Sequence, residues 1–235
     1  ILHREDTDGL DLTFGNAEAM VRMVERIALR RGFGDLLAEG TRRAAARIGK
    51  GSEALAMQVK GQEIPMHEPR RKPTMGLNYS TNAAGADHNT TVHDTDDLNG
   101  ATGEKLYKTA YLPQLINTLG ICRFVSWSEE QIREAVAAVT GRPLTDRELM
   151  QVVERGLTLS RIFNIREGFS DQDDALPKRF AETPSEGPLK GLDPQTFAEA
   201  RKGYYRLMGW DESGVPTRAR LAELGLDWAS RYLGS

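Results

Sequence analysis

Apolar residues recur at three- and four-residue spacing along most of the chain, the pattern of helices that bury one face. The first such run follows Asn16, which suits a helix N-cap, and stops at Gly32. A second run extends from about 35 to 48 and ends before Gly49, where a C-capping glycine belongs. We expect these two helices to form an antiparallel pair.

The second half of the chain shows the same periodicity with clearer end signals. Thr145 and Glu148 form a capping box, and Asp193 before Pro194 gives an N-cap followed by proline at the first helical position. Helices are predicted over 104–119 with a kink or break at Pro113, and over 128–141, 145–162, 194–209 and 217–224. With seven or eight helices and at most a minor short strand at 54–59, the predicted fold class is all-α and multihelical.

Prolines interrupt this pattern between the two halves. Three prolines between 65 and 73 exclude regular structure from the segment that carries His67 and Arg70, and a domain boundary fits near 61–73. Residues 76–97 are then polar and small, a composition that serves a core poorly. Such a stretch is typical of a functional loop or an irregular helix.

Charge and composition narrow the classes of function. Lys and Arg number 31 against 34 Asp and Glu, so the net charge is -3 and no global field attracts nucleic acid or an anionic membrane. The apolar runs fall far short of the roughly 18 residues that a membrane span needs. One cysteine excludes an internal disulfide framework and indicates a reducing, cytoplasmic setting. The chain starts at Ile1 inside a polar stretch, and we expect it to be a fragment.

Two residues are the first candidates for chemistry. Cys122 follows Gly120, which lets the chain turn after a helical run and present the thiol, but taken alone the residue is best interpreted as a small buried apolar side chain. A single thiolate cannot assemble a zinc or iron-sulfur site, since such sites need about four protein ligands. His88 follows small residues at 82–87 that would let a large ligand approach the backbone, although a hydrogen-bonding loop histidine is the simpler interpretation.

Two six-residue segments share one layout. In residues 6–11 and 117–122, an Asp or Asn precedes a glycine by three positions, and an apolar residue and then Asp or Cys follow. Backbone donors freed at such turns can grip the edge of a heterocycle or a phosphate, while turn capping explains most patterns of this kind.

Six further motifs follow one another along the chain. They are Gly32-Phe-Gly-Asp-Leu-Leu-Ala-Glu-Gly40, Lys60-Gly-Gln-Glu-Ile-Pro65 with Glu68-Pro-Arg70, Gly76-Leu-Asn-Tyr-Ser-Thr-Asn82, Asn164-Ile-Arg-Glu-Gly-Phe169, Leu176-Pro-Lys-Arg-Phe180, and Gly209-Trp-Asp211 with Gly214-Val-Pro-Thr217. Together with the two six-residue segments, they make the chain resemble the tungsten-containing aldehyde ferredoxin oxidoreductase family over nearly its whole length.

The resemblance implies a domain organisation. In that family an N-terminal β-rich domain covers one face of a bis-pterin tungsten cofactor, and two helical domains supply the other face. The chain would then comprise part of the middle helical domain at 1–60 and the C-terminal helical domain at 61–235, packed as two helical subdomains. Its own N-terminal β-rich domain would be missing and would be one of its partners.

The resemblance also implies the site residues. The family's two pterin-binding motifs, Asp-x-x-Gly-Leu followed by Asp or Cys, correspond to Asp6, Gly9, Leu10 and Asp11, and to Asn117, Gly120, Ile121 and Cys122. The second motif departs from the family pattern at two positions: Asn117 stands in place of Asp, and Ile121 in place of Leu. The Asp carboxylate is a charged acceptor, whereas the Asn carboxamide offers one acceptor and one donor. Cys122 corresponds to the fourth ligand of a 4Fe-4S cluster whose other three ligands, a Cys-x2-Cys-x3-Cys run, do not occur in this sequence. His88 corresponds to a histidine near the metal that is proposed to donate a hydrogen bond or a proton to the substrate oxygen.

The activity implied by the resemblance is oxidation of an aldehyde with water to a carboxylate. Electrons would pass through tungsten or molybdenum, the pterins and the cluster to ferredoxin. Because three cluster ligands are missing, we expect the isolated fragment to be inactive, and an exposed apolar cofactor face favours a homo-oligomer. Two alternatives stay open: the active-site subunit of a related benzoyl-CoA reductase, and a catalytically silent helical module. The sequence leaves the aldehyde and the choice of metal open.

Overall fold

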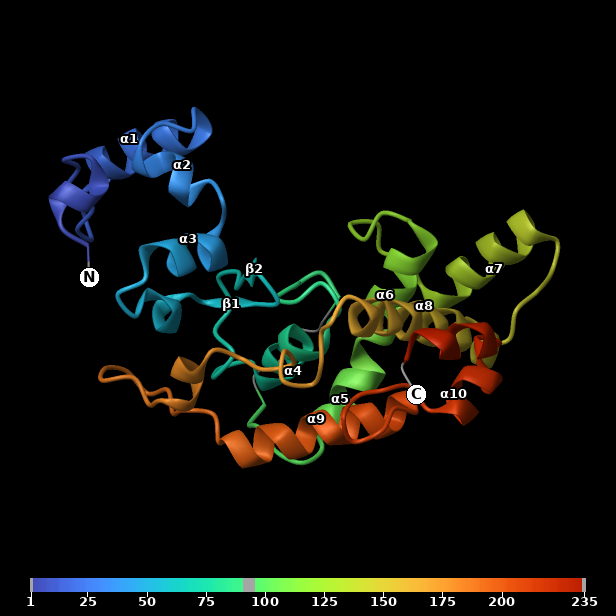
Figure 1. Cartoon of the computed structure of the whole chain (residues 1–235). Helices are drawn as coiled ribbons and strands as arrows, with labels where there is room; N and C mark the ends of the chain where they lie inside the picture. The colour runs from blue at the N-terminus through green and yellow to red at the C-terminus, as the bar shows by residue number, and fades with distance from the viewer. Residues whose placement is uncertain (1, 91–95, 234–235) are drawn as a thin grey trace.

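The computed structural model describes residues 2–90 and 96–233, and the described part of the chain is mostly helical, as predicted. The α-helices are α1 (Ala17–Ala28), α2 (Phe33–Leu37), α3 (Thr41–Ile48), α4 (Pro73–Thr81), α5 (Thr102–Thr109), α6 (Tyr111–Leu119), α7 (Glu129–Thr140), α8 (Asp146–Arg166), α9 (Pro194–Met208) and α10 (Arg218–Glu223). Short 3-10 helices span Arg4–Thr7, Ser52–Leu55, Lys178–Ala181 and Asp227–Tyr232. In Figure 1 the first three helices form a unit at one end, α4 lies centrally, and α6, α7, α8 and α10 occupy the other end.

The N-terminal unit packs α1 against α2 over a small core of Leu10, Met23 and Phe33. The single helix predicted from 35 to 48 is wrong, because Gly40 divides it into α2 and α3. Gly40 has φ +86°, a conformation that other residues rarely adopt and that ends one helix before the next begins. An apolar period alone cannot detect such a break, because the apolar residues Leu37, Ala44 and Ile48 continue at helical spacing across Gly40.

A short antiparallel hairpin links this unit to the rest of the chain. Strands β1 (Gln58–Val59) and β2 (Gln62–Glu63) pair with Gln58 opposite Glu63 and Val59 opposite Gln62. The predicted strand at 54–59 is therefore right only at its last two residues, because Ser52–Leu55 forms a 3-10 helix.

Helix α4 is the centre of the molecule, and every one of its residues is buried. The prediction that the polar, small residues from 76 onward serve a core poorly is therefore wrong for 76–81. Pro73 occupies the first helical position, where proline needs no hydrogen-bond donor. Ser80 and Thr81 donate their hydroxyls to the carbonyl of Leu77, so their polar groups are satisfied inside the helix. The loop prediction holds after residue 81, and residues 91–95 lie outside the described residues.

Within the described residues the C-terminal half builds three further cores, one of which joins Ile162 of α8 to Leu221 of α10. Helices α4, α5 and α9 share Leu77, Leu106 and Tyr205, while α6, α7 and α8 share Leu115, Ile132 and Leu149. The predicted helix at 104–119 is divided at Ala110 into α5 and α6, and Pro113 sits in the first turn of α6, where its missing N–H breaks no helical bond. The start signals for α7, α8, α9 and α10 are confirmed, since Ser128, Thr145, Asp193 and Thr217 all accept a capping bond. No helix within the described ranges is both long and apolar enough to cross a membrane.

Candidate functional site

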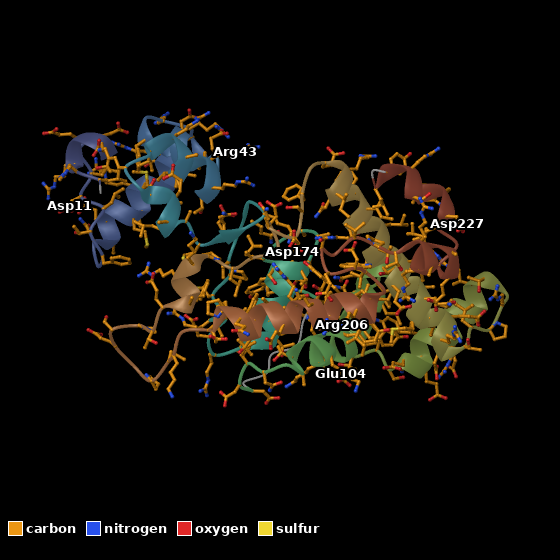
Figure 2. All side chains as sticks on the ribbon, turned by 60° about the horizontal axis from the view of Figure 1, so that its bottom comes forward. Asp11, Arg43, Glu104, Asp174, Arg206 and Asp227 are labelled. Atoms are coloured by element: carbon orange, nitrogen blue, oxygen red, sulfur yellow. The ribbon has the colours of Figure 1, made fainter. Side chains whose placement is uncertain are left out.

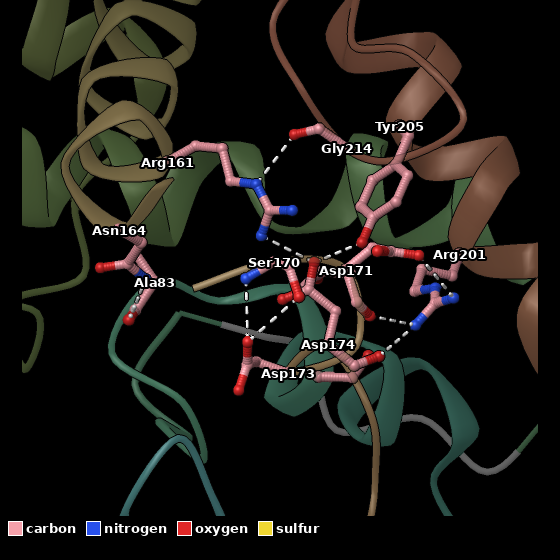
Figure 3. A network of polar contacts seen from close by, with 12 residues as sticks. Ala83, Arg161, Asn164, Ser170, Asp171, Asp173, Asp174, Arg201, Tyr205 and Gly214 are labelled. Atoms are coloured by element: carbon pink, nitrogen blue, oxygen red, sulfur yellow. Dashed lines mark hydrogen bonds and ion pairs between the residues drawn. The ribbon is translucent and has the colours of Figure 1, made fainter. Parts of the chain in front are cut away.

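A buried cluster of charges holds the middle of the molecule together. Asp174 is fully buried, and its carboxylate lies 2.6 Å from the Lys60 ammonium and 2.7 Å from Arg161 Nη1. The Tyr205 hydroxyl donates to the same carboxylate, as Figure 3 shows for the Arg161 and Tyr205 sides. Burial lowers the pKa of Lys60, against the attraction of Asp174, and raises the pKa of Tyr205.

This cluster fixes the hairpin against α4 and the loop that follows it. Lys60 has φ +53° and also donates to the carbonyl of Ser80. At Gly85 a side chain would lie 2.2 Å from the carbonyl oxygen of Val59, so only glycine allows the loop to approach the hairpin this closely. The amide of Asn164 on α8 donates to Ala83 at 2.9 Å and holds the other side of the loop. The loop that leads to His88 is therefore anchored from two elements.

The His88 loop is shaped by its own polar side chains. Asn78 on α4 donates to the carbonyl of Asp87 at 2.9 Å. Thr90 is buried, and its hydroxyl accepts from Asn82 at 2.8 Å and lies 3.2 Å from the Asp87 carboxylate. His88 itself is exposed. The loop therefore presents an imidazole on a rigid backbone.

A second histidine adjoins His88. The ring centroids of His67 and His88 are 5.5 Å apart, with the planes tilted by 52°. His67 comes from the proline-rich segment before α4, and its neighbour Met66 is fully exposed. The sequence placed His67 in an irregular segment but did not connect it with His88, because no spacing rule links two loops across a buried helix.

Cys122 lies on the turn that ends α6. Gly120 has φ +69° and closes the helix, and the Ile121 N–H donates to the carbonyl of Ile116 at 3.2 Å. The indole of Trp127 donates to the Cys122 carbonyl at 3.0 Å, which fixes the next turn. The thiol is exposed, so the interpretation of Cys122 as a buried apolar side chain is wrong. The Gly120 turn directs the residue outward, as the glycine signal indicated.

Arg123 brings the Cys122 turn and the His88 loop together. Its Nη1 donates to the carbonyl of Asn89 and lies 3.2 Å from the Asn89 side-chain oxygen, although the two residues are 34 positions apart. Asn89 follows His88, and Arg123 follows Cys122. Two of the predicted site residues therefore lie on adjoining loops, and sequence analysis missed the arginine that joins them.

The first six-residue segment lies elsewhere, in the N-terminal unit. Asp6 accepts from the His3 N–H at 2.9 Å and from Lys50 at 3.2 Å, and Asp11 accepts from Arg4 at 2.5 Å. These hydrogen bonds lower the pKa of both carboxyl groups, with the His3 backbone N–H the largest cause for Asp6 and the Arg4 side chain for Asp11. Figure 2 shows Asp11 in this unit, apart from the central Asp174. No hydrogen bond or ion pair among the described residues joins the segment to 117–122.

The two segments do share their turn geometry. Gly9 and Gly120 both have positive φ, and Leu10 and Ile121 both pack against cores. The N–H groups of these four residues are occupied by internal carbonyls. The backbone N–H groups of these turns were expected to be free for a ligand. That holds only for the sixth residue of each segment: the N–H groups of Asp11 and Cys122 meet no acceptor in the described part of the chain.

These groups fit part of the cofactor set that the resemblance implies. The exposed Cys122 thiol can act as one cluster ligand, and the exposed Asn117 carboxamide makes no hydrogen bond to the residues described. Within 2–90 and 96–233, no group of three or more His, Cys, Asp or Glu side chains is placed to hold a metal ion. The described part of the chain thus presents one exposed thiol and one exposed carboxamide on this turn, and no complete metal site.

Comparisons with known proteins find relatives along nearly the whole chain. Residues 1–226 match the family model described as aldehyde ferredoxin oxidoreductase, domains 2 and 3. The tungsten-containing aldehyde ferredoxin oxidoreductase of Pyrococcus furiosus is 34% identical in an alignment that covers 93% of this chain and 38% of the relative. An aliphatic sulfonate oxidoreductase, WOR-like subunit, of the same organism is 33% identical over 98% of this chain and 38% of its own length. The chain thus spans about two fifths of the length of the curated relatives it matches.

The fold is also found in a solved structure. The active-site complex BamBC of benzoyl coenzyme A reductase, in complex with 1,5-dienoyl-CoA, aligns with a TM-score of 0.71. The alignment covers 98% of this chain and 42% of that one, at 23% sequence identity. At this identity the likeness shows a shared fold.

Proposed function

The chain belongs to the aldehyde ferredoxin oxidoreductase family, whose domains 2 and 3 it matches, and on that premise we propose that it is the helical, cofactor-facing part of a cytoplasmic aldehyde-oxidising enzyme. The enzyme would use a tungsten or molybdenum bis-pterin cofactor and a 4Fe-4S cluster and would pass electrons to ferredoxin. Since the matched relatives are more than twice as long, the proposal includes a further domain on the same protein.

The observation that carries the proposal is the contact between Arg123 and Asn89. It places the proposed cluster ligand, Cys122, beside the loop of the proposed acid, His88. A site that oxidises a substrate and exports electrons needs both groups within a short distance of one cofactor. The adjoining loops that follow α6 and α4 meet that need. The side chains of Cys122 and His88 are both exposed and so are open to a cofactor.

The roles of the chain's own residues follow from their chemistry. Oxidation of an aldehyde by water yields a carboxylate, three protons and two electrons, and the bound cofactor and cluster would supply the acceptor for those electrons. His88 would donate a hydrogen bond or a proton to the substrate oxygen, for which an imidazole is suited near neutral pH. His67, whose ring lies beside it, would limit the orientations open to His88. Cys122 would provide the fourth cluster ligand as a thiolate.

The two six-residue segments would hold the pterins. Asp6 and Asp11 already accept bonds from Lys50 and Arg4, and both carboxylates remain partly exposed, so further acceptor positions face outward. Asn117 replaces a carboxylate by one acceptor and one donor, which weakens or reorients its pterin contact. The free N–H groups of Asp11 and Cys122 add one backbone donor at each segment.

Turnover by the holoenzyme tests the proposal against its nearest alternative. The benzoyl-CoA reductase fold match favours a second candidate, an enzyme for an aromatic thioester. Aldehyde-dependent reduction of ferredoxin, without reaction of benzoyl-CoA, is the expected result. Turnover of benzoyl-CoA with no aldehyde activity would replace the proposal by this candidate.

Metal analysis of the 235-residue chain tests whether its own residues are enough to bind the cluster and the metal cofactor. Because the chain offers one cysteine, we expect the purified chain alone to lack stoichiometric iron and tungsten and to be inactive, as a helical module would be. Stoichiometric metal in the chain alone would contradict the proposed division of ligands.

A further inference from the structure

Asn99 and Gly100 form an exposed pair just before α5. Six other asparagines occur in the sequence, and each of them is followed by a residue with a side chain. Asn99 alone precedes a glycine, and both residues of the pair are exposed to solvent. The backbone nitrogen of the next residue can attack an asparagine carboxamide, and glycine hinders that attack least because it has no Cβ. The pair is therefore where such a reaction meets the least steric resistance in this chain.

The backbone nitrogen of Gly100 is open to act as the nucleophile. Its N–H donates to no acceptor in the described part of the chain, so removal of its proton breaks no hydrogen bond of the fold. A Cβ placed on Gly100 would meet no atom within 4 Å, so the space around the residue is open. The N–H groups of Asn99 and Thr102, by contrast, donate to the Thr102 hydroxyl and to the Asn99 carbonyl, each at 3.1 Å. The fold thus holds the residues around the Gly100 nitrogen and leaves that nitrogen unprotected.

The Asn99 carboxamide is folded back toward this nitrogen and polarised. Its Oδ1 accepts from the Ala101 N–H at 2.8 Å, and this bond closes a turn that contains the Gly100 nitrogen. Its Nδ2 donates to the carbonyl of Asp97 at 3.1 Å. A donor on Oδ1 draws electron density from the carboxamide carbon and stabilises the negative charge that attack places on that oxygen. The Ala101 N–H is placed to act as the donor of an oxyanion hole does.

We propose that Asn99 is a site of spontaneous deamidation, a reaction of the chain with itself that consumes only water. The Gly100 nitrogen loses its proton and forms a bond to the Asn99 Cγ, while the bond from Cγ to Nδ2 breaks and the nitrogen leaves as ammonia. Water then opens the resulting succinimide at either carbonyl and yields aspartate or isoaspartate. The sum is asparagine and water to an aspartyl residue and ammonia, with no oxidant or reductant. The proposal does not depend on the proposed function.

The isoaspartyl product alters the main chain at the start of α5. It routes the backbone through the side chain of residue 99 and so adds one methylene group before Gly100. The Asn99 carbonyl, which accepts from the Thr102 N–H, then no longer lies on the main path of the chain. One residue later, a Cβ on Gly103 would lie 2.2 Å from the Ala200 carbonyl oxygen, because α5 and α9 pack side by side at close range (Figure 1). A displaced first turn of α5 therefore disturbs this helix contact.

Peptide mass spectrometry of the aged chain tests the proposal. The full chain is incubated for several days at mildly alkaline pH and digested, and the peptides are assayed for a gain of about 1 Da and for labelling by an isoaspartate methyltransferase. We expect Asn99 to react at least about 10-fold faster than Asn117, an exposed asparagine followed by threonine. Equal rates at the two residues would remove the role assigned to Gly100 and overturn the proposal.

Gly100→Ala is the matched variant. The φ angle of Gly100 is not positive and its surroundings are open, so alanine fits the fold, yet its Cβ hinders the attack and should slow deamidation at least about 10-fold. An unchanged rate would refute the succinimide route. The urea-unfolded chain supplies the reference rate, and the folded chain should react at no less than about a tenth of it. A slower reaction would show that the fold protects Asn99 and would overturn the proposal.

Urea denaturation measures the effect on α5. The isoaspartyl protein is compared with Asn99→Asp, which adds the same charge near the start of the helix, where the helix dipole favours it, on an unaltered main chain. We expect the lower unfolding midpoint for the isoaspartyl protein. Equal midpoints would contradict the claim that the modification disturbs the contact between α5 and α9.

Discussion

Replacing Asp174 by Asn should destabilise the protein more than any surface charge change. The substitution removes one fully buried carboxylate from Lys60, Arg161 and the Tyr205 hydroxyl. Two cations then remain buried beside a neutral amide, at distances where water cannot screen them. The amide oxygen can still accept one bond, so the cost falls at the lower end of the range for broken buried pairs.

That range is about 3–5 kcal/mol, and we expect about 3 kcal/mol for Asp174→Asn. A chain of this size has an urea m-value near the top of the usual ~1–3 kcal/mol/M, so the unfolding midpoint should fall by about 1 M. The slope itself should stay the same, because the surface exposed on unfolding does not change. Loss of the carboxylate should also loosen the hairpin and the His88 loop that Lys60 anchors through Ser80.

Urea denaturation followed by far-UV circular dichroism measures this effect. Glu104→Gln is the control, since Glu104 forms an exposed pair with Lys108 at 2.5 Å and should leave the midpoint unchanged. A midpoint shift below about 0.3 M for Asp174→Asn, equal to that of the control, would refute the view that the buried cluster holds the middle of the molecule.

Three further outcomes are expected. Burial and a hydrogen bond to Glu154 raise the pKa of Tyr107 to about 12. The free energy of unfolding should therefore keep this contribution below about pH 10 and lose it as the pH rises toward about 12. In Tyr107→Phe, the urea unfolding midpoint should fall less over the same pH range. Gly85→Ala should cost about 3 kcal/mol through its clash with the hairpin, whereas Gly168→Ala, with a similar φ and open space, should cost about 1–2 kcal/mol; equal losses would contradict the close-approach argument. Arg123→Ala should speed amide hydrogen exchange in residues 87–90 relative to Arg123→Lys, and identical exchange in the two variants would show that the arginine does not position the His88 loop.

Local end signals made the later helices predictable. Ser128 and Thr145 begin helices in the structure because their side chains satisfy N–H groups that no helical carbonyl can reach. Gly120 ends α6 for a comparable reason, since its positive φ closes the turn. These signals act within a few residues of the chain, so a single sequence contains them in full.

The features that a single sequence does not contain are those that depend on long-range contacts. Helix α4 looked too polar for a core because its hydroxyls are satisfied inside their own turn, which the composition does not reveal. Lys60 and Asp174 are 114 positions apart in the sequence and meet only after the hairpin folds onto the centre. Arg123 and Asn89 meet across two loops in the same way. The exposed position of Cys122 was also not predicted, because the usual burial of free thiols outweighed the signal of the glycine turn.

Electron paramagnetic resonance of the reduced holoenzyme with Cys122→Ala tests the proposed site most directly. Ser126→Ala, an exposed change in the same turn, is the matched control and should retain the full 4Fe-4S signal. If Cys122 is the fourth ligand, the Cys122→Ala protein should lose that signal and its iron content should fall. A 4Fe-4S signal of full intensity in Cys122→Ala would contradict the assignment of this turn to the cluster and, with it, the proposed division of the site between Cys122 and His88.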